Sequence, residues 1–341
     1  MILDSLTERE SLVLHALVKA HIETSSPIGS HTIGRQGALG ISPATIRSTL
    51  VTLEKKGFLV QPHTSAGRLP TEKGYRFYVA YKLAADREEW DEDEGWLRQQ
   101  VESGICEGHL DEITAQLAQV IGNVSRQLGV VMAPRFEQGV FQKLELIGLS
   151  SHRLLLVLSV ELAPVKSLVI EVEAQVSQQA LDGTCRLLNE RLSGLSLAEI
   201  RRTGRQRLDT LEGCHPQLLR LVTAELEELT GPVMPRLHVA GASNICRQPE
   251  FSDPAKMAAL MDVVERKDVL AQLLGDRQGV VVTIGGENSP MEMQLCSIVT
   301  ASYTLGSGTG VIGVIGPMRM PYVRVVGLVD YIANRATQLM A

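Results

Sequence analysis

The sequence predicts an α+β protein of several domains that begins with a winged helix-turn-helix. Three observations support this class. The 341 residues are 44% hydrophobic and 21% charged, a composition typical of folded domains with sizeable cores. The first 82 residues show signals for helix, short helix, turn, helix and hairpin, in that order. Farther along the chain, strand-like segments stand on both sides of a mostly helical stretch, which indicates an α+β domain that carries an insertion.

Charge is distributed unevenly along the chain, whose net formal charge is −6. Residues 1–82 contain ten Lys and Arg and six Asp and Glu, a net charge of +4, so the remainder carries −10. Residues 24–82 alone carry +6, with eight basic and two acidic side chains. A basic segment attached to an acidic body is typical of a DNA-binding module joined to a regulatory domain.

The first two helices are predicted from capping signals and apolar spacing. Thr7 begins a Thr-Glu-Arg-Glu sequence in which Glu10 can return a hydrogen bond to the cap, so a helix should start there. It should end shortly before Pro27. A second, short polar helix is expected over roughly residues 30–36.

A third helix is expected to start at Ser42, a favourable N-cap, with Pro43 at the first helical position, where its missing N–H costs nothing. Gly57 should end it, because glycine adopts the left-handed conformation without a Cβ penalty. The residues spaced to face a small core are Ile46, Leu50 and Leu53.

The opposite face of the third helix is mostly small, polar or basic, which suits a helix that reads the DNA major groove. Arg47 is the first candidate for a base contact, because arginine can donate two hydrogen bonds to guanine. Lys55 and Lys56 are assigned to phosphate, and exposed lysines that contact only solvent are the alternative. The candidate DNA-binding residues on this helix are Ser42, Ala44, Thr45, Arg47, Ser48, Thr49, Thr52 and Lys55. A core-packing helix beside a surface hairpin is the alternative reading of this stretch.

Two short strand signals flank a polar loop at residues 61–67, which predicts a hairpin that serves as the wing. The wing residues expected to contact phosphates or the minor groove are His63, Thr64, Ser65 and Arg68. A further helix begins near Pro70, and its aromatic side chains are expected to pack against the module instead of stacking on bases.

Residues 83–109 are expected to form an acidic linker, because the run at 86–94 contains seven carboxylates. In the rest of the chain, helices are predicted from apolar periodicity over residues 110–128, 179–192, 216–229, 254–274 and 321–338. Strands are predicted over residues 141–149, 153–160, 165–172, 236–240, 280–284, 296–302 and 310–316.

The stretch SPATIRSTLVTLEKKGFLVQPHTSAGRLPTEKGYRFYV resembles the N-terminal signature of HrcA, a family of heat-inducible transcription repressors of bacteria. The SPATIR helix, the QPHTSAGR hairpin and the PTEKGYRFYV continuation occur together in the order of that signature. The segments IGGEN, CSIVTASY and GVIGVIGPMRM are similar to the C-terminal part of the family, so the resemblance covers nearly the whole chain. Family members most often carry Asn or another polar residue where this chain has Ser48 and Thr49.

This resemblance implies a domain organisation and a biological role. A winged-helix domain at 1–82 would precede a GAF-like domain made of 110–173 and 276–341, interrupted by a dimerising domain at 174–275. The resemblance also implies a cytoplasmic bacterial repressor of chaperone operons that loses activity on heat shock. Its partners would be an inverted-repeat operator called CIRCE and the GroEL chaperonin. A homodimer is also expected on physical grounds, because a single winged helix makes too few contacts, whereas a symmetric dimer reads two half-sites.

Other functions find little support in the residues, and an enzyme is not expected. The glycine clusters at 285–286 and 306–310 lack the Lys-Ser/Thr of a phosphate-binding loop and are interpreted as hairpin turns. The histidines have no paired spacing and the five cysteines form no Cys-x-x-Cys, so neither a metal site nor a cofactor is predicted. The apolar stretch at 154–172 is interrupted by charged residues and proline, so no membrane span is expected. A small-molecule effector bound by the GAF-like domain is the alternative function.

Overall fold

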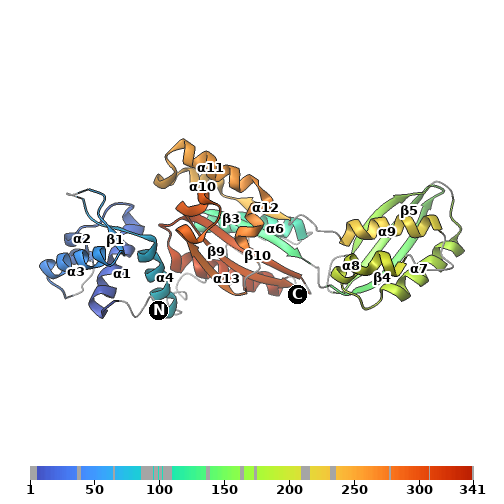
Figure 1. Cartoon of the computed structure of the whole chain (residues 1–341), viewed down its shortest axis with the longest axis horizontal. Helices are drawn as coiled ribbons and strands as arrows, with labels where there is room; N and C mark the ends of the chain where they lie inside the picture. Colours follow the sequence, from blue (N-terminus) through green and yellow to red (C-terminus); the bar gives the residue numbers. More distant parts are fainter. Residues whose placement is uncertain are drawn as a thin grey trace. The chain divides into compact units, whose positions relative to one another are not determined.

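A computed structural model describes residues 6–36, 40–63, 66–85, 95, 99, 102, 110–135, 139–161, 165–172, 175–208, 216–230, 236–275, 278–306 and 308–339. The chain divides into two compact units (Figure 1). The first contains Met1–Met132, Leu237–Ser302 and Val311–Ala333, and the second contains Ala133–Arg236, Tyr303–Gly310 and Asn334–Ala341. Helices and antiparallel strand pairs occur in both units, so the predicted α+β class is confirmed.

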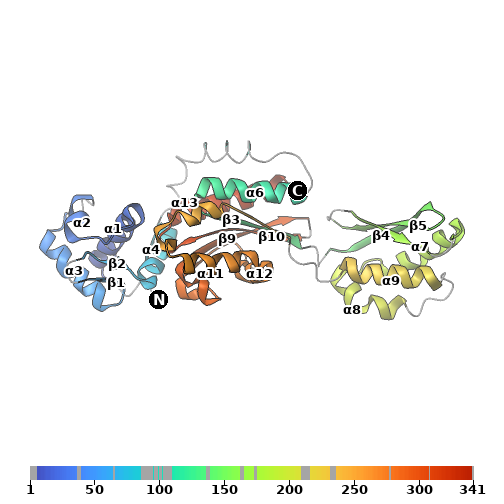
Figure 2. The ribbon, with the colours of Figure 1, turned by 90° about the horizontal axis from the view of Figure 1, so that it is seen from above.

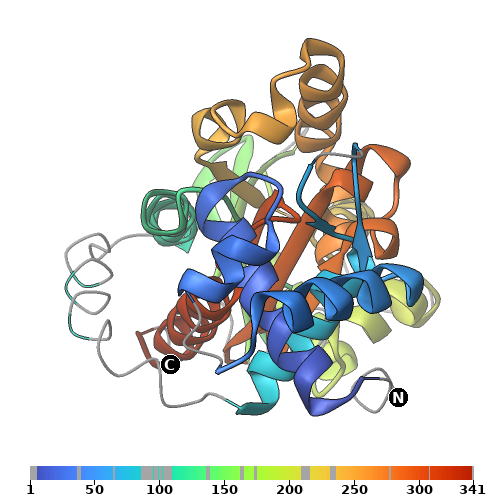
Figure 3. The same ribbon diagram turned by 90° about the vertical axis from the view of Figure 1, so that its left-hand side faces the viewer.

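The N-terminal module, residues 6–85, belongs to the first unit and faces the viewer in Figure 3. Its elements are α1 (Glu8–Thr24), α2 (Ser30–Gln36), α3 (Pro43–Lys55), β1 (Leu59–Val60), β2 (Leu69–Pro70) and α4 (Glu72–Ala85). Helix α1 begins at the predicted capping box, where the Glu10 N–H donates to Thr7 Oγ1 at 3.3 Å and the Thr7 N–H donates to Glu10 Oε2 at 2.7 Å. The two strands pair antiparallel. The order of elements is therefore the one that the sequence predicts.

The core of this module is closed by side chains from α1, α3, the hairpin and α4. Leu17 and Ile46 are fully buried, and Phe58 packs edge-to-face on Phe77 with ring centroids 5.9 Å apart. The aromatic side chains of α4 that are buried are Tyr75, Phe77 and Tyr78. These rings pack inside the protein, as expected from their helical spacing.

The central domain, most of which belongs to the first unit, is built on a five-stranded sheet with the order β7-β3-β10-β9-β8. The strands are β3 (Leu128–Arg135), β7 (Leu237–Ala240), β8 (Val280–Ile284), β9 (Cys296–Leu305) and β10 (Gly308–Pro317). β3 pairs antiparallel with β7, and β8 pairs antiparallel with β9, so β8 is an edge strand. Short helical segments in this domain are α10 (Ala242–Cys246), η3 (Pro249–Phe251), η4 (Gly285–Glu287) and η5 (Met291–Leu295).

Helices cover both faces of the five-stranded sheet (Figure 2). Those on one face are α6 (Leu110–Ser125) and α13 (Tyr322–Leu339), and those on the other are α11 (Pro254–Glu265) and α12 (Lys267–Leu274). Alternation along β9 separates the two cores. Ile298 packs with Leu260 and Leu270 from α11 and α12, whereas the Ser297 hydroxyl lies 2.7 Å from Tyr322 Oη of α13.

The second unit contains a separate antiparallel sheet with the order β4-β5-β6. Its elements are β4 (Phe141–Ser150), β5 (Arg153–Val160), β6 (Lys166–Glu171), α7 (Gln178–Leu192), α8 (Leu197–Leu208) and α9 (Pro216–Thr230). The helices bury one face of the sheet, with Leu144, Leu156 and Leu188 fully buried in the shared core. On the opposite face Ile147 pairs with Leu155, which in turn pairs with Val169, and Ile147 and Val169 are 45% and 48% exposed.

The domain limits differ from those expected. Strands at 141–171 were expected to join the C-terminal strands, but they form their own sheet and pack with α7, α8 and α9. Residues 237–274 were expected in the insertion, but they pack with the five-stranded sheet. The chain leaves the first unit at Ala133 and returns at Leu237. Strand periodicity shows that a segment is half-buried without showing which strand it pairs with, and this explains the difference.

Several local elements also differ from expectation. The helix predicted at 110–128 ends at Ser125, where Arg126 takes a left-handed φ of 53°, and residues 128–135 form β3. The helix predicted at 254–274 is broken at Arg266, whose backbone is extended. Gly285 starts a 3₁₀ helix instead of a hairpin turn, whereas Gly306 lies in the turn between β9 and β10 as predicted.

The acidic run at 86–94 lies outside the described residues, as does most of the linker predicted at 83–109. Helix α8 was not predicted, because its four arginines leave little apolar signal. Within the described part of the chain, no helix is both long enough and apolar enough to cross a membrane.

Candidate nucleic-acid interface

Helix α3 is held in place by its N-cap and by one apolar face. Ser42 Oγ accepts a hydrogen bond from the Thr45 N–H at 3.2 Å, and Pro43 occupies the first turn. Ile46 and Leu53 are both 0% exposed. Because these side chains fix the rotation of the helix about its axis, they also determine which residues face solvent.

The solvent-facing side of α3 carries most of the predicted DNA-binding residues. Those that are exposed are Ser42, Ala44, Arg47, Ser48, Thr52 and Lys55. None of the residues that the structure describes forms an ion pair or side-chain hydrogen bond with Arg47 or Lys55, so both charges are open to an anionic ligand. Thr45 is half-buried, and its hydroxyl lies 2.9 Å from Ser42 Oγ.

The hydroxyl groups on this face are anchored to the helix backbone. Ser48 Oγ donates to the Thr45 carbonyl at 2.9 Å, and Thr52 Oγ1 donates to the Ser48 carbonyl at 3.1 Å. Each oxygen keeps lone pairs that can accept a hydrogen bond from a base amino group. Their orientation is therefore set before any ligand arrives.

Thr49 does not belong to this surface. The sequence predicted that it would contact DNA, and the structure shows that it is buried in the module. The residue is 5% exposed, and its hydroxyl donates to the Thr45 carbonyl at 2.9 Å. Thr49 lies three positions after Ile46 and four before Leu53, so helical spacing places it on the inner face. Thr49 is a packing residue of the module.

The hairpin is fastened to the segment before α2. The Ile28 N–H donates to the Arg68 carbonyl at 2.9 Å, and the Arg68 N–H donates to the Ile28 carbonyl at 2.8 Å. A Cβ at Gly67 would lie 2.5 Å from the Ile28 carbonyl carbon, so only glycine fits there without a shift. Gln61 Nε2 also donates to the Ala66 carbonyl at 3.0 Å, which closes the base of the loop.

The predicted wing residues are placed differently from one another. His63 is exposed in the loop, whereas Thr64 and Ser65 lie outside the described residues. Arg68 is bound within the module: its Nε and Nη2 both lie 3.1 Å from Glu54 Oε2. Sequence reasoning missed this role of Glu54, because the two residues are 14 positions apart and no local spacing marks the pair.

A second ion pair joins the end of α3 to the start of α1. Lys56 Nζ lies 2.9 Å from Glu10 Oε2, the same carboxylate that completes the α1 capping box. Burial acts to raise the pKa of Glu10, but the hydrogen bond from the Thr7 backbone and the contact with Lys56 outweigh it and hold that pKa below its ordinary value. Lys56 was expected to contact phosphate, but in this structure its ammonium group is paired with Glu10 of the same module.

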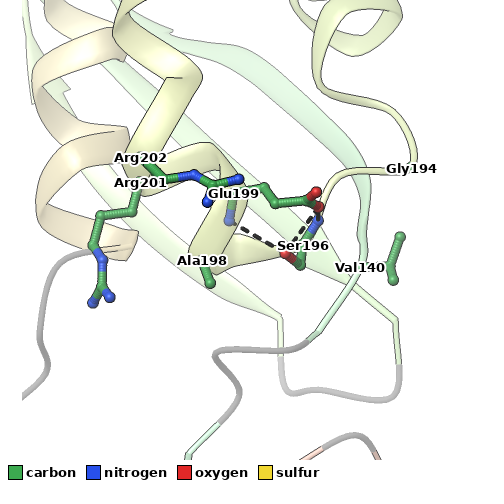
Figure 4. A pocket seen from close by; sticks show the side chains of 7 residues that line it. All are labelled: Val140, Gly194, Ser196, Ala198, Glu199, Arg201 and Arg202. Atoms are coloured by element: carbon green, nitrogen blue, oxygen red, sulfur yellow. Dashed lines mark hydrogen bonds between the residues drawn. The ribbon is translucent and has the colours of Figure 1, made fainter.

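Residues outside the module offer less for ligand chemistry. Among the residues described, no group of three or more His, Cys, Asp and Glu side chains is arranged to hold a metal ion. A cleft of about 920 Å³ in the second unit is lined by Val140, Gly194, Ser196, Ala198, Glu199, Arg201 and Arg202 (Figure 4).

The polar groups at the start of α8 in this cleft are already paired. The Ser196 N–H donates to Glu199 Oε2 at 2.9 Å, and the Glu199 N–H donates to Ser196 Oγ at 3.2 Å, a capping arrangement. The cleft also lies in the second unit, whereas an effector was expected in the domain with the C-terminal strands. It therefore adds no support to effector sensing there.

Comparison with known proteins agrees with the sequence signature. Residues 111–326 match the family model described as the HrcA protein C terminal domain. The chain is 38% identical to the heat-inducible transcription repressor HrcA of Chlorobium phaeobacteroides, with 100% of both chains covered. It is 39% identical to the protein of the same name from Prosthecochloris aestuarii, over 97% of this chain and 96% of that one.

One solved structure shares the fold over nearly the whole length. A crystal structure described as that of a hypothetical protein matches with a TM-score of 0.65 and 23% identity, covering 98% of this chain and 99% of the other. Because the family model covers more than half of the sequence and the relatives match it from end to end, the chain belongs to the HrcA family.

Proposed function

We propose that this protein is a heat-inducible transcription repressor that binds double-stranded DNA through its N-terminal module. The observation that carries the proposal is the exposed polar and basic face of α3, which stands beside a hairpin in the basic part of an acidic chain. The name of the curated relatives supports the same role. On this proposal the module is a winged helix-turn-helix, with α3 as the recognition helix.

Helix α3 enters the major groove in the proposed complex. Arg47 reads a guanine through two hydrogen bonds, and Ser48 and Thr52 contact neighbouring base edges. Ala44 packs against a thymine methyl group. Lys55, at the exposed end of the helix, contacts phosphate.

The start of α3 faces the DNA backbone. Ser42 and Thr45 lie at this N-terminus, where backbone N–H groups and the helix dipole favour a phosphate. The hairpin is the wing: His63, Thr64 and Ser65 approach phosphates or the minor groove. Arg68 shares its guanidinium between Glu54 and a phosphate, because a guanidinium has five N–H donors and Glu54 occupies only some of them.

The active form is a homodimer that reads the two halves of an inverted repeat. The row formed by Ile147, Leu155 and Val169 on the open face of the second unit supports this proposal. Exposed apolar side chains in adjacent strands are typical of interaction surfaces. A second copy of the chain fits the row best, since an apolar patch is self-complementary across a two-fold axis. The second unit is then the dimerising domain, and the central domain is the GAF-like domain.

The identity of the operator and of a further partner comes from the family resemblance. We infer that the operator is the CIRCE inverted repeat upstream of chaperone genes, and that the GroEL chaperonin maintains the active form. Both act in the bacterial cytoplasm. If GroEL has this role, the fraction of repressor that binds operator after mild heating rises when GroEL is present. An equal active fraction with and without GroEL would remove the chaperonin from the proposal.

The central experiment is a gel-shift titration with an inverted-repeat duplex and a scrambled duplex of equal length and composition. Both are measured at one fixed salt concentration, because phosphate contacts make affinity strongly salt-dependent. Specific binding should exceed binding to the scrambled duplex by a factor of at least about 10³. Equal affinity for the two duplexes would contradict sequence-specific repression.

A further inference from the structure

Two arginine side chains, one from each domain, join the N-terminal module to the central domain within the first unit. Arg319 follows β10 and donates to the module, whereas Arg76 on α4 donates to the central sheet. Each guanidinium binds one backbone carbonyl of the other domain and one carboxylate of the central domain. We call the contacts of these two arginines the junction.

Arg319 completes the C-terminal end of α1. Its Nη1 donates to the Ile22 carbonyl at 3.1 Å, its Nε donates to Glu250 Oε1 at 2.7 Å, and its Nη2 donates to Gln248 Oε1 at 2.9 Å. The last carbonyls of a helix lack intrahelical partners and carry the negative end of its dipole, so a guanidinium is well suited to this place. With only 13% of its side chain exposed, Arg319 is held on three sides.

Arg76 closes the outer edge of the five-stranded sheet. Its Nη1 and Nη2 each donate to the Val282 carbonyl at 3.0 Å, and its Nε donates to Glu287 Oε1 at 2.9 Å. Val282 lies on the edge strand β8, whose outward carbonyls have no neighbouring strand to pair with. Glu287 is itself oriented by the Ile284 N–H, which donates to its Oε2 at 2.9 Å.

Buried groups of the module and the central domain also meet at the junction. The Tyr75 and Tyr322 rings, 3% and 2% exposed, lie with their centroids 6.2 Å apart. Gly285 has a φ of 57°, and a Cβ there would lie 2.4 Å from the Glu72 carboxyl carbon, so α4 approaches this backbone closely. Rotating the module would break charge-assisted hydrogen bonds and expose both rings.

We propose that Arg76 and Arg319 are positioning residues that fix the orientation of α3 and thereby determine the spacing of half-sites that the dimer accepts. This inference rests on the proposed function. In a symmetric dimer, the separation of two recognition helices depends on every joint between them. A joint held by two multidentate guanidinium groups is stiff, so a narrow range of operator spacings fits both helices.

The experiment measures affinity against a series of operators with identical half-sites and spacers that differ by single base pairs. Changing the spacer by about two base pairs turns one half-site by roughly 70° relative to the other, given one turn per 10–10.5 base pairs. The wild-type protein should lose affinity tenfold or more at such a change. The Arg76→Ala/Arg319→Ala double variant should lose less than about threefold, with base preference inside each half-site retained.

A matched control separates orientation from loss of charge. Lys256→Ala/Arg266→Ala removes two exposed basic side chains of the central domain and should keep the wild-type spacing profile. If the double variant is poorly folded, Glu250→Gln/Glu287→Gln weakens both contacts at nearly unchanged size and should broaden the profile in the same direction. A folded variant with the sharp wild-type profile would overturn the proposal. A uniform loss of affinity at every spacing would also do so.

A second measurement needs no DNA and keeps the inference separate from the proposed function. Amide hydrogen exchange in the last turn of α1 and in β8 should be roughly tenfold faster in the double variant, with α3 unchanged. Unaltered exchange at both places would overturn the junction as a stiff joint. Wild-type protein that treats inverted-repeat and scrambled duplexes alike would instead overturn the proposed function.

Discussion

Arg68 and Glu54 join the hairpin to helix α3 through a single carboxylate oxygen, with Arg68 Nε and Nη2 both 3.1 Å from Glu54 Oε2. The side chains are 19% and 33% exposed, so the pair lies at the surface of the module and not in its core. Glu54 is one of only two acidic residues between positions 24 and 82. Its charge holds Arg68 of the hairpin to α3 and, in the proposed complex, opposes the approach of phosphates.

Replacing Glu54 with glutamine should raise affinity for all DNA. The change removes a negative charge near the proposed phosphate contacts and releases Arg68, so binding to scrambled duplex should increase about two- to fivefold. The dependence of log affinity on log salt should steepen by up to about 1. Gel shifts at several salt concentrations measure both quantities, and an unchanged slope would show that releasing Arg68 from Glu54 adds no phosphate contact.

Arg47→Ala and Lys55→Ala should fail in different ways. Loss of Arg47 should cost on the order of 1–3 kcal/mol of operator binding and relax the base preference at one position of each half-site. Loss of Lys55 should weaken specific and scrambled duplexes alike and reduce the salt slope by about 1. Competition against single-base operator variants distinguishes them. Unchanged preference in Arg47→Ala would refute the groove assignment.

A charge on the open sheet of the second unit should dissociate the proposed dimer. In Ile147→Glu/Val169→Glu, two carboxylates per copy would have to be buried, which is costly without partners. Sedimentation analysis should show a shift toward monomer, and operator affinity should fall at least about tenfold. Met291→Glu is the control, because Met291 is a 77% exposed apolar residue of the central domain. Equal dimerisation of both variants would place the interface elsewhere.

Stability of the module should depend on pH through Glu10. Its pKa in the folded state lies below the ordinary value of about 4.3. The unfolded state therefore binds the proton more readily, and the stabilising contribution is present above about pH 4.3 and lost as pH falls through the lower folded value. The unfolding free energy of wild type should exceed that of Glu10→Gln near pH 7, and the difference should shrink toward pH 3. A constant difference would argue against a lowered pKa for Glu10 in the folded state.

Gly67 tests how closely the hairpin packs on Ile28. Gly67→Ala places a methyl group against backbone atoms that cannot move aside as a side chain can, and it should destabilise the module by about 1–3 kcal/mol. Gly29→Ala is the comparison, since no atom lies within 4 Å of its added Cβ. It should cost less than about 1 kcal/mol. Denaturant unfolding measures both, and equal losses would contradict the close approach.

Local signals in the sequence predict the module well. The capping box at Thr7, the cap at Ser42 and the apolar spacing of α3 act within one or two helical turns, and the structure forms each as expected. Thr49 was also within reach of such reasoning, because its spacing from Ile46 and Leu53 already places it inside. The mistake was to treat a polar side chain as an exposed one.

Contacts between distant segments could not be read from the sequence in the same way. Arg68 and Glu54 lie on different elements, and Arg319 and Ile22 are separated by 297 positions and belong to different domains. The assignment of residues 141–171 to a separate sheet likewise depends on strand pairing, which is decided by tertiary packing. Periodicity identified those strands and left their partners open.

The hydrogen bond from Arg319 to Ile22 spans 297 positions of the chain, which has a consequence during synthesis. At about 5–20 residues per second, ribosomes need roughly 15–60 s to add those residues. For most of that interval helix α3 has been synthesised, whereas Arg319, which donates to the last turn of α1, has not. A polypeptide released early, before position 319, would carry the N-terminal module without the Arg319 contacts that join it to the central domain.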